Sequence, residues 1–350
     1  MLAAVGAALF LRADLVPRPY LFARGVVLLG AAALFAAPIA QGAVVYSVTD
    51  AMFTAMRLLA YVIFAHLPVW GAVAAWRLWS TARRRAAASV GCVVVVVAIG
   101  VDAFLVEPTA LEVRTVIVES SKVTRPIHIA LVADIQTDGP TDYERRALER
   151  VAAAKPDLVL YAGDYAHADD WPSYLESMKR LNAMLRAVAI DAPLGQFAVR
   201  GNVDAPDHWT TLFDGTSIRA REPTTRYAVK AEVEVAALSF SDSFDDRLQI
   251  TPSDRFLVAF GHGPDFALGD VPADLMLAGH THGGQVQLPF VGPIVTLSKV
   301  PRAWASGVTR FDDGRTLIVA RGVGLERGPA PRLRFLCRPE LVFIEVRPAS

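Results

Sequence analysis

The 350-residue sequence predicts an α/β fold, a layered sandwich of strands and helices preceded by N-terminal transmembrane helices. Three observations lead to this prediction. The first 106 residues contain three long apolar stretches. From residue 107 onwards, amphipathic helical patterns alternate with short apolar strands, and the second half is rich in strands. Finally, five of the strands end in a turn that carries Asp, Asn or His.

The apolar stretches cover residues 25–46, 58–76 and 86–106. Each is close to the roughly 20 residues that a helix needs to cross a bilayer. A cleaved signal peptide would be one such stretch with a cleavage site, whereas three follow one another here. We therefore expect a membrane anchor of about three helices over residues 1–106. The alternative is a set of buried helices in a soluble domain.

The arginines predict how this anchor is oriented. Arg83, Arg84 and Arg85 lie between the second and third stretches, whereas the link over residues 47–56 holds no Lys or Arg. The positive-inside rule places such an arginine cluster in the cytoplasm. Everything after residue 106 then lies outside the cytoplasmic membrane. Residues 1–11 are apolar but too short to span a bilayer, and their role stays open.

Charge and cysteine content exclude other classes of protein. The chain has 35 basic and 35 acidic residues, and from residue 107 onwards the acidic ones are in excess. A nucleic-acid-binding domain would need a basic face, so we expect no nucleic-acid partner. Cys92 lies within an apolar stretch and Cys337 lies near the end of the chain, so no disulfide framework is implied.

Residues 107–350 have the length of one large domain. Apolar side chains at helical spacing predict amphipathic helices over residues 143–154 and 174–189. Short apolar runs predict strands over residues 114–119, 127–133, 158–161, 197–199, 233–239, 256–260, 275–278, 316–320 and 341–346. This order of elements is typical of a layered α/β sandwich.

Polar clusters follow five of these strands in turn. They contain Asp134 and Gln136, Asp164, Asn202 and Asp204, His262, and lastly His280 and His282. In open α/β sheets, sites form beyond the carboxyl ends of the strands. Asp, Asn and His supply oxygen and imidazole donors that suit Mn, Fe, Zn or Mg. Five such turns in order predict a metal centre, and a two-metal centre would hold a hydroxide and clamp a phosphoryl group.

The most informative cluster is Gly-His-Thr-His-Gly-Gly-Gln over residues 279–285. Side chains at positions i and i+2 of an extended segment point the same way, so His280 and His282 can converge on one site. The glycines that follow allow a sharp turn and leave space beside the histidines. The alternative is a pair of surface histidines on a loop.

This series of turns resembles that of the calcineurin-like metallophosphoesterases, in particular the bacterial membrane-anchored branch whose last motif is Gly-His-Thr-His-Gly-Gly-Gln. The resemblance covers roughly residue 127 to the end of the chain. It implies a four-layer α/β/β/α sandwich over residues 107–350 and two divalent metal ions, of Mn, Fe, Mg or Zn. Asp134 and His282 would bind the first ion and Asp164 would bridge both. The second ion would be bound by Asn202, His262 and His280.

Two positions depart from the family pattern. Gln136 stands where the family usually has a His ligand, and its neutral amide oxygen should weaken the first site and tilt it away from Zn. Val203 stands where the family usually has a His that is proposed to protonate the leaving oxygen, which Val cannot do. His208 and His167 are the candidates to replace that acid, and Asp204 is a further catalytic candidate.

We therefore expect a hydrolase of the bacterial inner membrane, with its metal centre outside the cytoplasm. It would cleave a phosphodiester, a pyrophosphate or a phosphomonoester through a metal-bridging hydroxide. The anchor suggests a phosphorylated substrate at the membrane surface, such as a lipid-linked one. The alternative is a catalytically weakened domain that binds a phosphorylated ligand or a partner without turnover.

Overall fold

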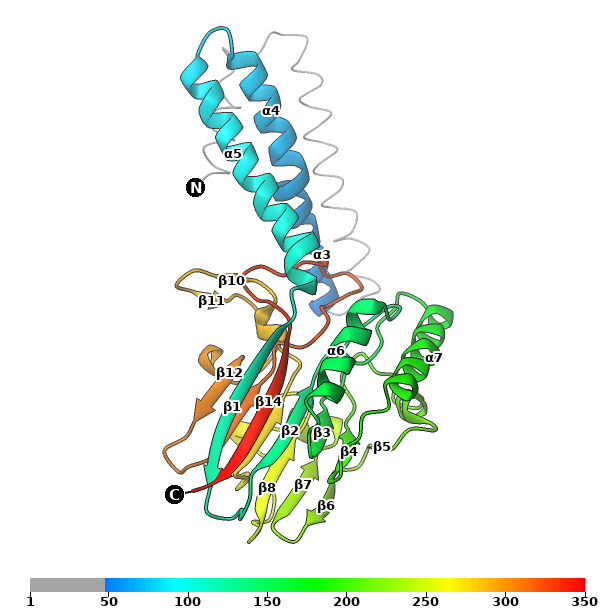
Figure 1. The fold of residues 1–350 in the computed structure, drawn as a ribbon. Helices are drawn as coiled ribbons and strands as arrows, with labels where there is room; N and C mark the ends of the chain where they lie inside the picture. The colour runs from blue at the N-terminus through cyan, green and yellow to red at the C-terminus, as the bar shows by residue number, and fades with distance from the viewer. Residues whose placement is uncertain (1–47, 350) are drawn as a thin grey trace. The chain divides into compact units, whose positions relative to one another are not determined.

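The computed structural model describes residues 48–349, which divide into two compact units (Figure 1). The first contains the residues up to Val90 together with Pro329–Pro331, and the second contains Gly91–Gly328 and the rest of the C-terminal segment. The first expected span, over residues 25–46, lies outside the described residues.

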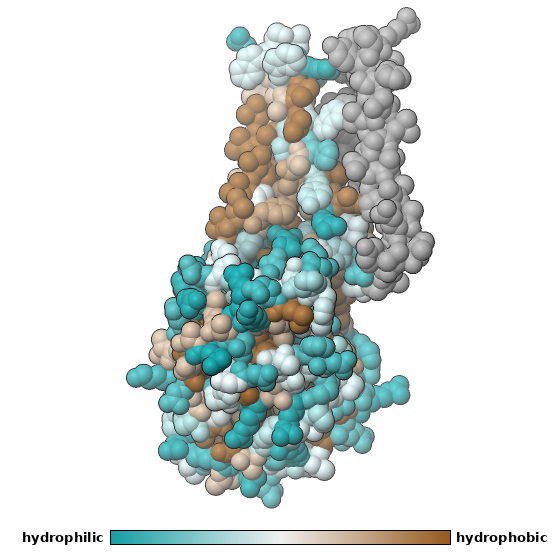
Figure 2. Space-filling view, turned by 90° about the vertical axis from the view of Figure 1, so that its right-hand side faces the viewer, coloured by the Kyte–Doolittle hydropathy of each residue, from teal (hydrophilic) through white to brown (hydrophobic). Residues whose placement is uncertain are grey.

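Two long helices open the described chain. The first, Thr49–Leu78, contains α3 (Val48–Tyr61) apart from its first residue, the π-helical η2 (Val62–His66) and α4 (Leu67–Leu78). The second, Arg83–Thr109, comprises α5 (Arg83–Val101), η3 (Asp102–Val106) and η4 (Glu107–Thr109). Both are long and apolar enough to cross a membrane, by length and composition alone, and Figure 2 shows hydrophobic side chains gathered along them. The expected spans 58–76 and 86–106 lie within these helices.

The first of two six-stranded sheets has the order β1-β14-β2-β3-β4-β5. Its strands are β1 (Glu112–Ser120), β2 (Ile127–Val132), β3 (Leu158–Tyr161), β4 (Gly195–Ala198), β5 (Ile218–Ala220) and β14 (Glu340–Pro348). The pair β14–β2 is antiparallel and the other pairs are parallel. The sheet is therefore mixed, and β2, β3 and β4 end at the same edge.

The second sheet has the order β12-β13-β9-β8-β7-β6. Its strands are β6 (Thr225–Lys230), β7 (Val233–Ala237), β8 (Phe256–Phe260), β9 (Leu275–Ala278), β12 (Gly307–Arg310) and β13 (Thr316–Val319). The four central strands run parallel and the two outer ones run antiparallel to them. A separate hairpin joins β10 (Gln287–Leu288) to β11 (Gly292–Pro293).

Apolar side chains from both sheets form one buried cluster, which includes Leu160 and Phe197 of the first sheet and Val258 and Leu277 of the second. A second cluster joins the other face of the first sheet to α6 (Asp142–Ala153), α7 (Trp171–Val188) and η5 (Trp209–Phe213).

Short segments cover the other face of the second sheet. They are η6 (Asp265–Leu268) and η8 (Arg302–Trp304), and α8 (Phe240–Ser243) contacts η6. Phe266, at the centre of η6, is fully buried against this face. The predicted α/β fold is confirmed, and both of its six-stranded sheets are mixed.

Local sequence explains where the two main helices begin. Thr141 caps α6 by accepting from the backbone N–H of Tyr143, while Glu144 accepts from the backbone N–H of Thr141. Asp170 caps α7 by accepting from the backbone N–H of Ser173. The predicted helices thus begin one to three residues earlier than apolar spacing alone indicated.

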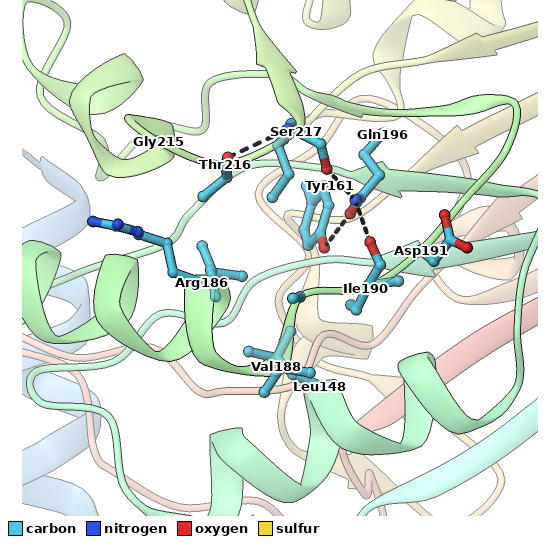
Figure 3. A pocket seen from close by; sticks show the side chains of 13 residues that line it. Leu148, Tyr161, Arg186, Val188, Ile190, Asp191, Gln196, Gly215, Thr216 and Ser217 are labelled. Atoms are coloured by element: carbon cyan, nitrogen blue, oxygen red, sulfur yellow. Dashed lines mark hydrogen bonds between the residues drawn. The ribbon is translucent and has the colours of Figure 1, made fainter.

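A hollow of about 480 Å³ lies between the end of α7 and the strands β3 to β5 (Figure 3). The Tyr161 hydroxyl donates to Gln196 Oε1, and Gln196 Nε2 donates to the Ile190 carbonyl and to Ser217 Oγ. These polar groups satisfy one another, and none of the predicted site residues lines the hollow.

Candidate metal centre

The strand-end turns hold their side chains through an uncommon backbone conformation. Asp134, Gln136, Asp164, His280 and His282 all have φ between 38° and 69°. Such left-handed conformations cost a non-glycine residue on the order of 1 kcal/mol or more, and they cluster at functional sites. Each of these five residues was predicted as a metal ligand from the sequence alone.

Hydrogen bonds lock these turns to one another. The Asp134 carboxylate accepts from the backbone N–H of His280, at 3.0 and 3.1 Å to its two oxygens. Asp164 Oδ1 accepts from the backbone N–H of Val203 at 2.9 Å. The buried Asp204 carboxylate accepts from the backbone N–H groups of Asp164, Tyr165 and Gly201, each at 2.8 Å. Asp204 therefore joins the second turn to the third.

On one side of the centre, Asp134, Asp164 and His282 are buried, and their ligand atoms lie within 4.8 Å of one another. His282 Nε2 and Gln136 Oε1 are buried atoms without a hydrogen-bond partner. Buried polar atoms are almost always hydrogen-bonded. Two unpaired buried atoms at the predicted metal site therefore indicate that a ligand binds there.

The contacts of the Gln136 amide nitrogen explain why the amide oxygen has no partner. Its nitrogen lies 3.1 Å from His167 Nδ1 and 3.1 Å from Glu326 Oε1. Both are acceptors when His167 carries its proton on Nε2, so the two amide hydrogens are used there. The oxygen is left free to bind a cation, which is what a Gln in place of His must do.

The other side is organised around one amide oxygen. Asn202 Oδ1 lies 2.8 Å from His262 Nε2 and 2.9 Å from His280 Nδ1. His262 Nδ1 lies 2.8 Å from the Ala162 carbonyl, and His280 Nε2 lies 3.1 Å from the Leu297 carbonyl. The three predicted ligands of the second ion thus converge.

Close packing explains two of the glycines in the motifs. A Cβ on Gly201 would lie 2.1 Å from Asp164 Oδ1. A Cβ on Gly279 would lie 2.6 Å from Asp134 Oδ2. Any larger residue at either position would displace a carboxylate of the centre, so the glycines are required by space.

The electrostatics favour a bound cation. Burial raises the pKa of Asp134 to about 7, and burial together with the Asp164 charge raises the pKa of Asp204 to about 7. Burial would also raise the pKa of Asp164, but the neighbouring His262 holds it below its usual range. Burial likewise raises the pKa of Glu326 to about 7. Four crowded acidic groups are the environment that a divalent ion neutralises.

The two histidines at Asn202 have opposite shifts. Burial lowers the pKa of His262, but the charge and hydrogen bond of Asp164 and the charge of Asp134 together outweigh it and raise the value to about 9. Burial and the neighbouring His262 lower the pKa of His280 to about 4. His280 is therefore neutral at pH 7, as a metal ligand must be.

Several supporting residues carry no signal in the local sequence. The fully buried Arg334 donates to the carbonyls of Cys337 and Arg321 at 2.9 and 2.7 Å. The Cys337 thiol donates to the His282 carbonyl at 3.2 Å. Along with Glu326, these residues come from a segment distant in sequence from the five motifs, and no sequence pattern indicated their role at the site.

The two acid candidates lie in different surroundings. His167 contacts Gln136 and lies 3.5 Å from Glu326 Oε1. His208 is exposed, and its ring packs edge-on against Trp171 at 4.9 Å between centroids. Val203 contributes its backbone N–H to Asp164, as described above.

Comparison with known proteins agrees with this geometry. Residues 127–284 match the family described as calcineurin-like phosphoesterase. The uncharacterized metallophosphoesterase YkuE of Bacillus subtilis is 32% identical over 208 residues, which cover 55% of this chain and 69% of YkuE. The phosphodiesterase YaeI of Escherichia coli is 28% identical, over 63% of this chain and 82% of YaeI. The UDP-2,3-diacylglucosamine pyrophosphatase LpxG of Chlamydia muridarum is 23% identical, over 62% of this chain and 83% of LpxG.

Proposed function

This chain belongs to the calcineurin-like metallophosphoesterase family and is a metal-dependent phosphoric ester hydrolase, and we propose that it uses two divalent ions to cleave a phosphodiester or pyrophosphate at a membrane surface. The observation that carries the proposal is the pair of orphaned buried atoms, Gln136 Oε1 and His282 Nε2, beside the cluster of Asp134, Asp164 and His282.

The residues divide between two ions as follows. Asp134, Gln136 and His282 would hold the first ion, Asp164 would be shared, and Asn202, His262 and His280 would hold the second. When bound, the ions supply an activated water and neutralise charge on the phosphoryl oxygens. The chain's part is to hold seven ligand side chains in place through strained turns and the Asp204 hydrogen bonds.

The substrate class follows from Val203. Because this side chain cannot supply a proton, the reaction is best suited to a leaving group that departs without help. Pyrophosphates and aryl phosphodiesters release a weakly basic phosphate or phenolate, whereas alkyl phosphodiesters and alkyl phosphomonoesters release an alkoxide and form a slower class. We propose His167 and His208 as the residues to test for a remaining acid role, and Asp204 as a positioning residue.

The organisation that we propose is a membrane anchor over residues 1–106 and a phosphoesterase domain over residues 107–350, with the four layers of the family. Three spans with Arg83, Arg84 and Arg85 in the cytoplasm would place the domain outside the inner membrane of a bacterium. A phosphorylated, lipid-linked substrate fits this location, and no nucleic acid is proposed as a partner. The two apolar helices support the anchor.

The test is turnover of bis-p-nitrophenyl phosphate by the full chain in detergent with Mn²⁺. Asp164→Ala and His280→Ala are the test variants, and Asp313→Ala, on an exposed turn, is the matched control. We expect turnover in the parent and the control and its loss in the two test variants. Equal rates in all four, with unchanged melting temperatures, would favour the alternative, a domain that binds a phosphorylated ligand without turnover.

A further inference from the structure

A hairpin next to the metal centre is apolar and exposed. Residues 286–298, called the apolar hairpin below, contain β10 and β11 and no charged residue. Phe290 at its tip is fully exposed. The other exposed large apolar side chains of this segment are Leu288, Val291, Ile294 and Leu297. Contiguous apolar exposure of this kind marks an interaction surface.

Backbone hydrogen bonds tie the apolar hairpin to the end of the second apolar helix. Gln287 N–H donates to the Phe335 carbonyl at 2.9 Å, and Phe335 N–H donates to the Gln285 carbonyl at 2.9 Å. The next link is Arg334 N–H, which donates to the Ala103 carbonyl at 3.0 Å. One short segment therefore bridges β10 and the last turns of helix Arg83–Thr109.

A buried carboxylate fixes the same bridge from the other side. Glu107 is 3% exposed, and it accepts from the backbone N–H groups of Leu336, at 2.9 Å, and Cys337. Leu336 itself is exposed, as are Leu105 and Val106 on the helix. Exposed apolar side chains therefore occur on the helix end, on the bridge and on the hairpin, which the backbone hydrogen bonds join.

The base of the apolar hairpin forms part of the wall of the metal centre. The Leu297 carbonyl lies 3.1 Å from His280 Nε2. Gly284, which follows the histidine motif, lies so close to β11 that a Cβ there would be 2.5 Å from the Pro293 Cβ. The position of the hairpin and the position of His280 are therefore linked.

We propose that the apolar hairpin inserts its tip into the interface of the lipid bilayer and holds the metal centre against the headgroup layer. The proposal rests on the proposed membrane anchor, because the argument for lipid as the occupant is continuity with the helix Arg83–Thr109. The hairpin has only two pairs of residues in its ladder, so its free backbone groups need water or headgroups. It would therefore reach the boundary of headgroups and acyl chains without spanning the membrane. The substrate would be a phosphoester whose lipid part stays in the bilayer.

The direct test measures lipid contact at the tip. Phe290→Cys, made in a Cys92→Ser background, is labelled with nitrobenzoxadiazole in the full chain and placed in phosphatidylcholine–phosphatidylglycerol nanodiscs; Cys337 is buried. The control is Asp313→Cys in the turn before β13, at the amino end of a strand that runs parallel to β9 and so opposite the metal centre. We expect blue-shifted emission and quenching by doxyl lipids at position 290 and neither at 313. A label at 290 that is unquenched, or shielded by a protein partner or a second copy, would overturn the proposal.

The functional test distinguishes a role of the hairpin in membrane contact from a role in catalysis. The double variant Phe290→Ser/Val291→Ser is compared with the parent on bis-p-nitrophenyl phosphate and on phosphatidyl-p-nitrophenol in vesicles. We expect a loss on the order of tenfold on the lipid ester only, because the apolar area that enters the interface is removed. Equal losses on both substrates would overturn the proposal. If the parent cleaves neither substrate, the proposed function fails while the quenching result still decides the role of the hairpin.

Discussion

The two halves of the metal centre use similar donors but are held differently. On the side of the proposed first ion, Gln136 Oε1 and His282 Nε2 are buried and have no partner. On the side of the proposed second ion, His262 and His280 both lie against the Asn202 amide oxygen. The first half is thus built to leave donor atoms unpaired, whereas the second half has an alternative set of contacts. We infer that the first half depends more strongly on its ion.

The largest effect should come from the residue that both halves share. Asp164→Asn keeps the shape of the side chain but removes the charge, and we expect a loss of turnover on the order of 10³-fold. Metal analysis of the purified protein should show lower occupancy of both ions. A variant that kept two ions and the parental rate would show that Asp164 is not the shared ligand.

Removing one ligand from each half tests whether the two halves depend on their ions to different degrees. His282→Ala and His280→Ala should each lower affinity for Mn²⁺, on the order of 10- to 100-fold, since removing even a supporting group of a metal site has effects of this size. We expect the larger loss of affinity for His282→Ala. Removing His280 leaves Asn202 and His262 able to pair with each other, whereas the donor atoms of the first half have no such partners. Calorimetric titration of metal-free protein measures both. A larger loss for His280→Ala would reverse the inference.

The departures from the family pattern allow a gain of function. Val203→His restores the missing proton donor, and we expect the rate on an alkyl phosphodiester to rise on the order of tenfold, the lower end of what acid catalysis contributes. The rate on bis-p-nitrophenyl phosphate, whose leaving group needs no proton, should change less. An equal change in rate on both substrates would show that the absence of a proton donor at position 203 does not limit departure of the leaving group.

The same logic applies to the first ion. Gln136→His should raise affinity for Zn²⁺ relative to Mn²⁺, because imidazole suits Zn²⁺ better than an amide oxygen does. Gln136→Ala is the control and should weaken both metals. Competition between the two ions, followed by metal analysis, gives the ratio, and a ratio unchanged by Gln136→His would argue against Gln136 as a ligand.

The last prediction concerns the pH dependence of stability. The pKa of His262 is raised to about 9 in the folded protein, against about 6.5 when unfolded. The folded state then holds more protons than the unfolded state between these values, so stability is complete below pH 6.5 and is lost as pH rises through 9. Metal-free protein should lose about 2 kcal/mol between pH 7 and 9, roughly 4–8 °C in melting temperature. Metal-loaded protein should lack this slope, since a ligating His262 is neutral, and a slope shared by both forms would contradict the assignment.

Much of the scaffold was predictable because its signals are local. The strands at Leu158–Tyr161, Phe256–Phe260 and Leu275–Ala278 have the predicted bounds, since each is a short apolar run that ends at a glycine or a small residue. The polar turns after them contain the ligand-type residues that the structure brings together. Short strands such as β5 and β12 were missed, because three or four residues at a sheet edge carry too little periodicity to detect.

The supports of the site were not predictable, for a physical reason. Glu326 reaches Gln136 across 190 positions of sequence, and Glu107 reaches Cys337 across 230. Neither residue belongs to a periodic pattern or a cap, and burial of a carboxylate is normally unfavourable unless it is paired. Only the fold shows which groups pair with them. Local sequence likewise gave no sign that the apolar hairpin contacts His280.

The most direct test of the two-ion centre is a crystal structure of the full chain with Mn²⁺, with anomalous scattering recorded at the Mn edge. We predict two anomalous peaks on either side of Asp164, the first within roughly 2.0–2.4 Å of Gln136 Oε1. A single peak, or a first peak whose ligands do not include Gln136, would contradict the proposed centre.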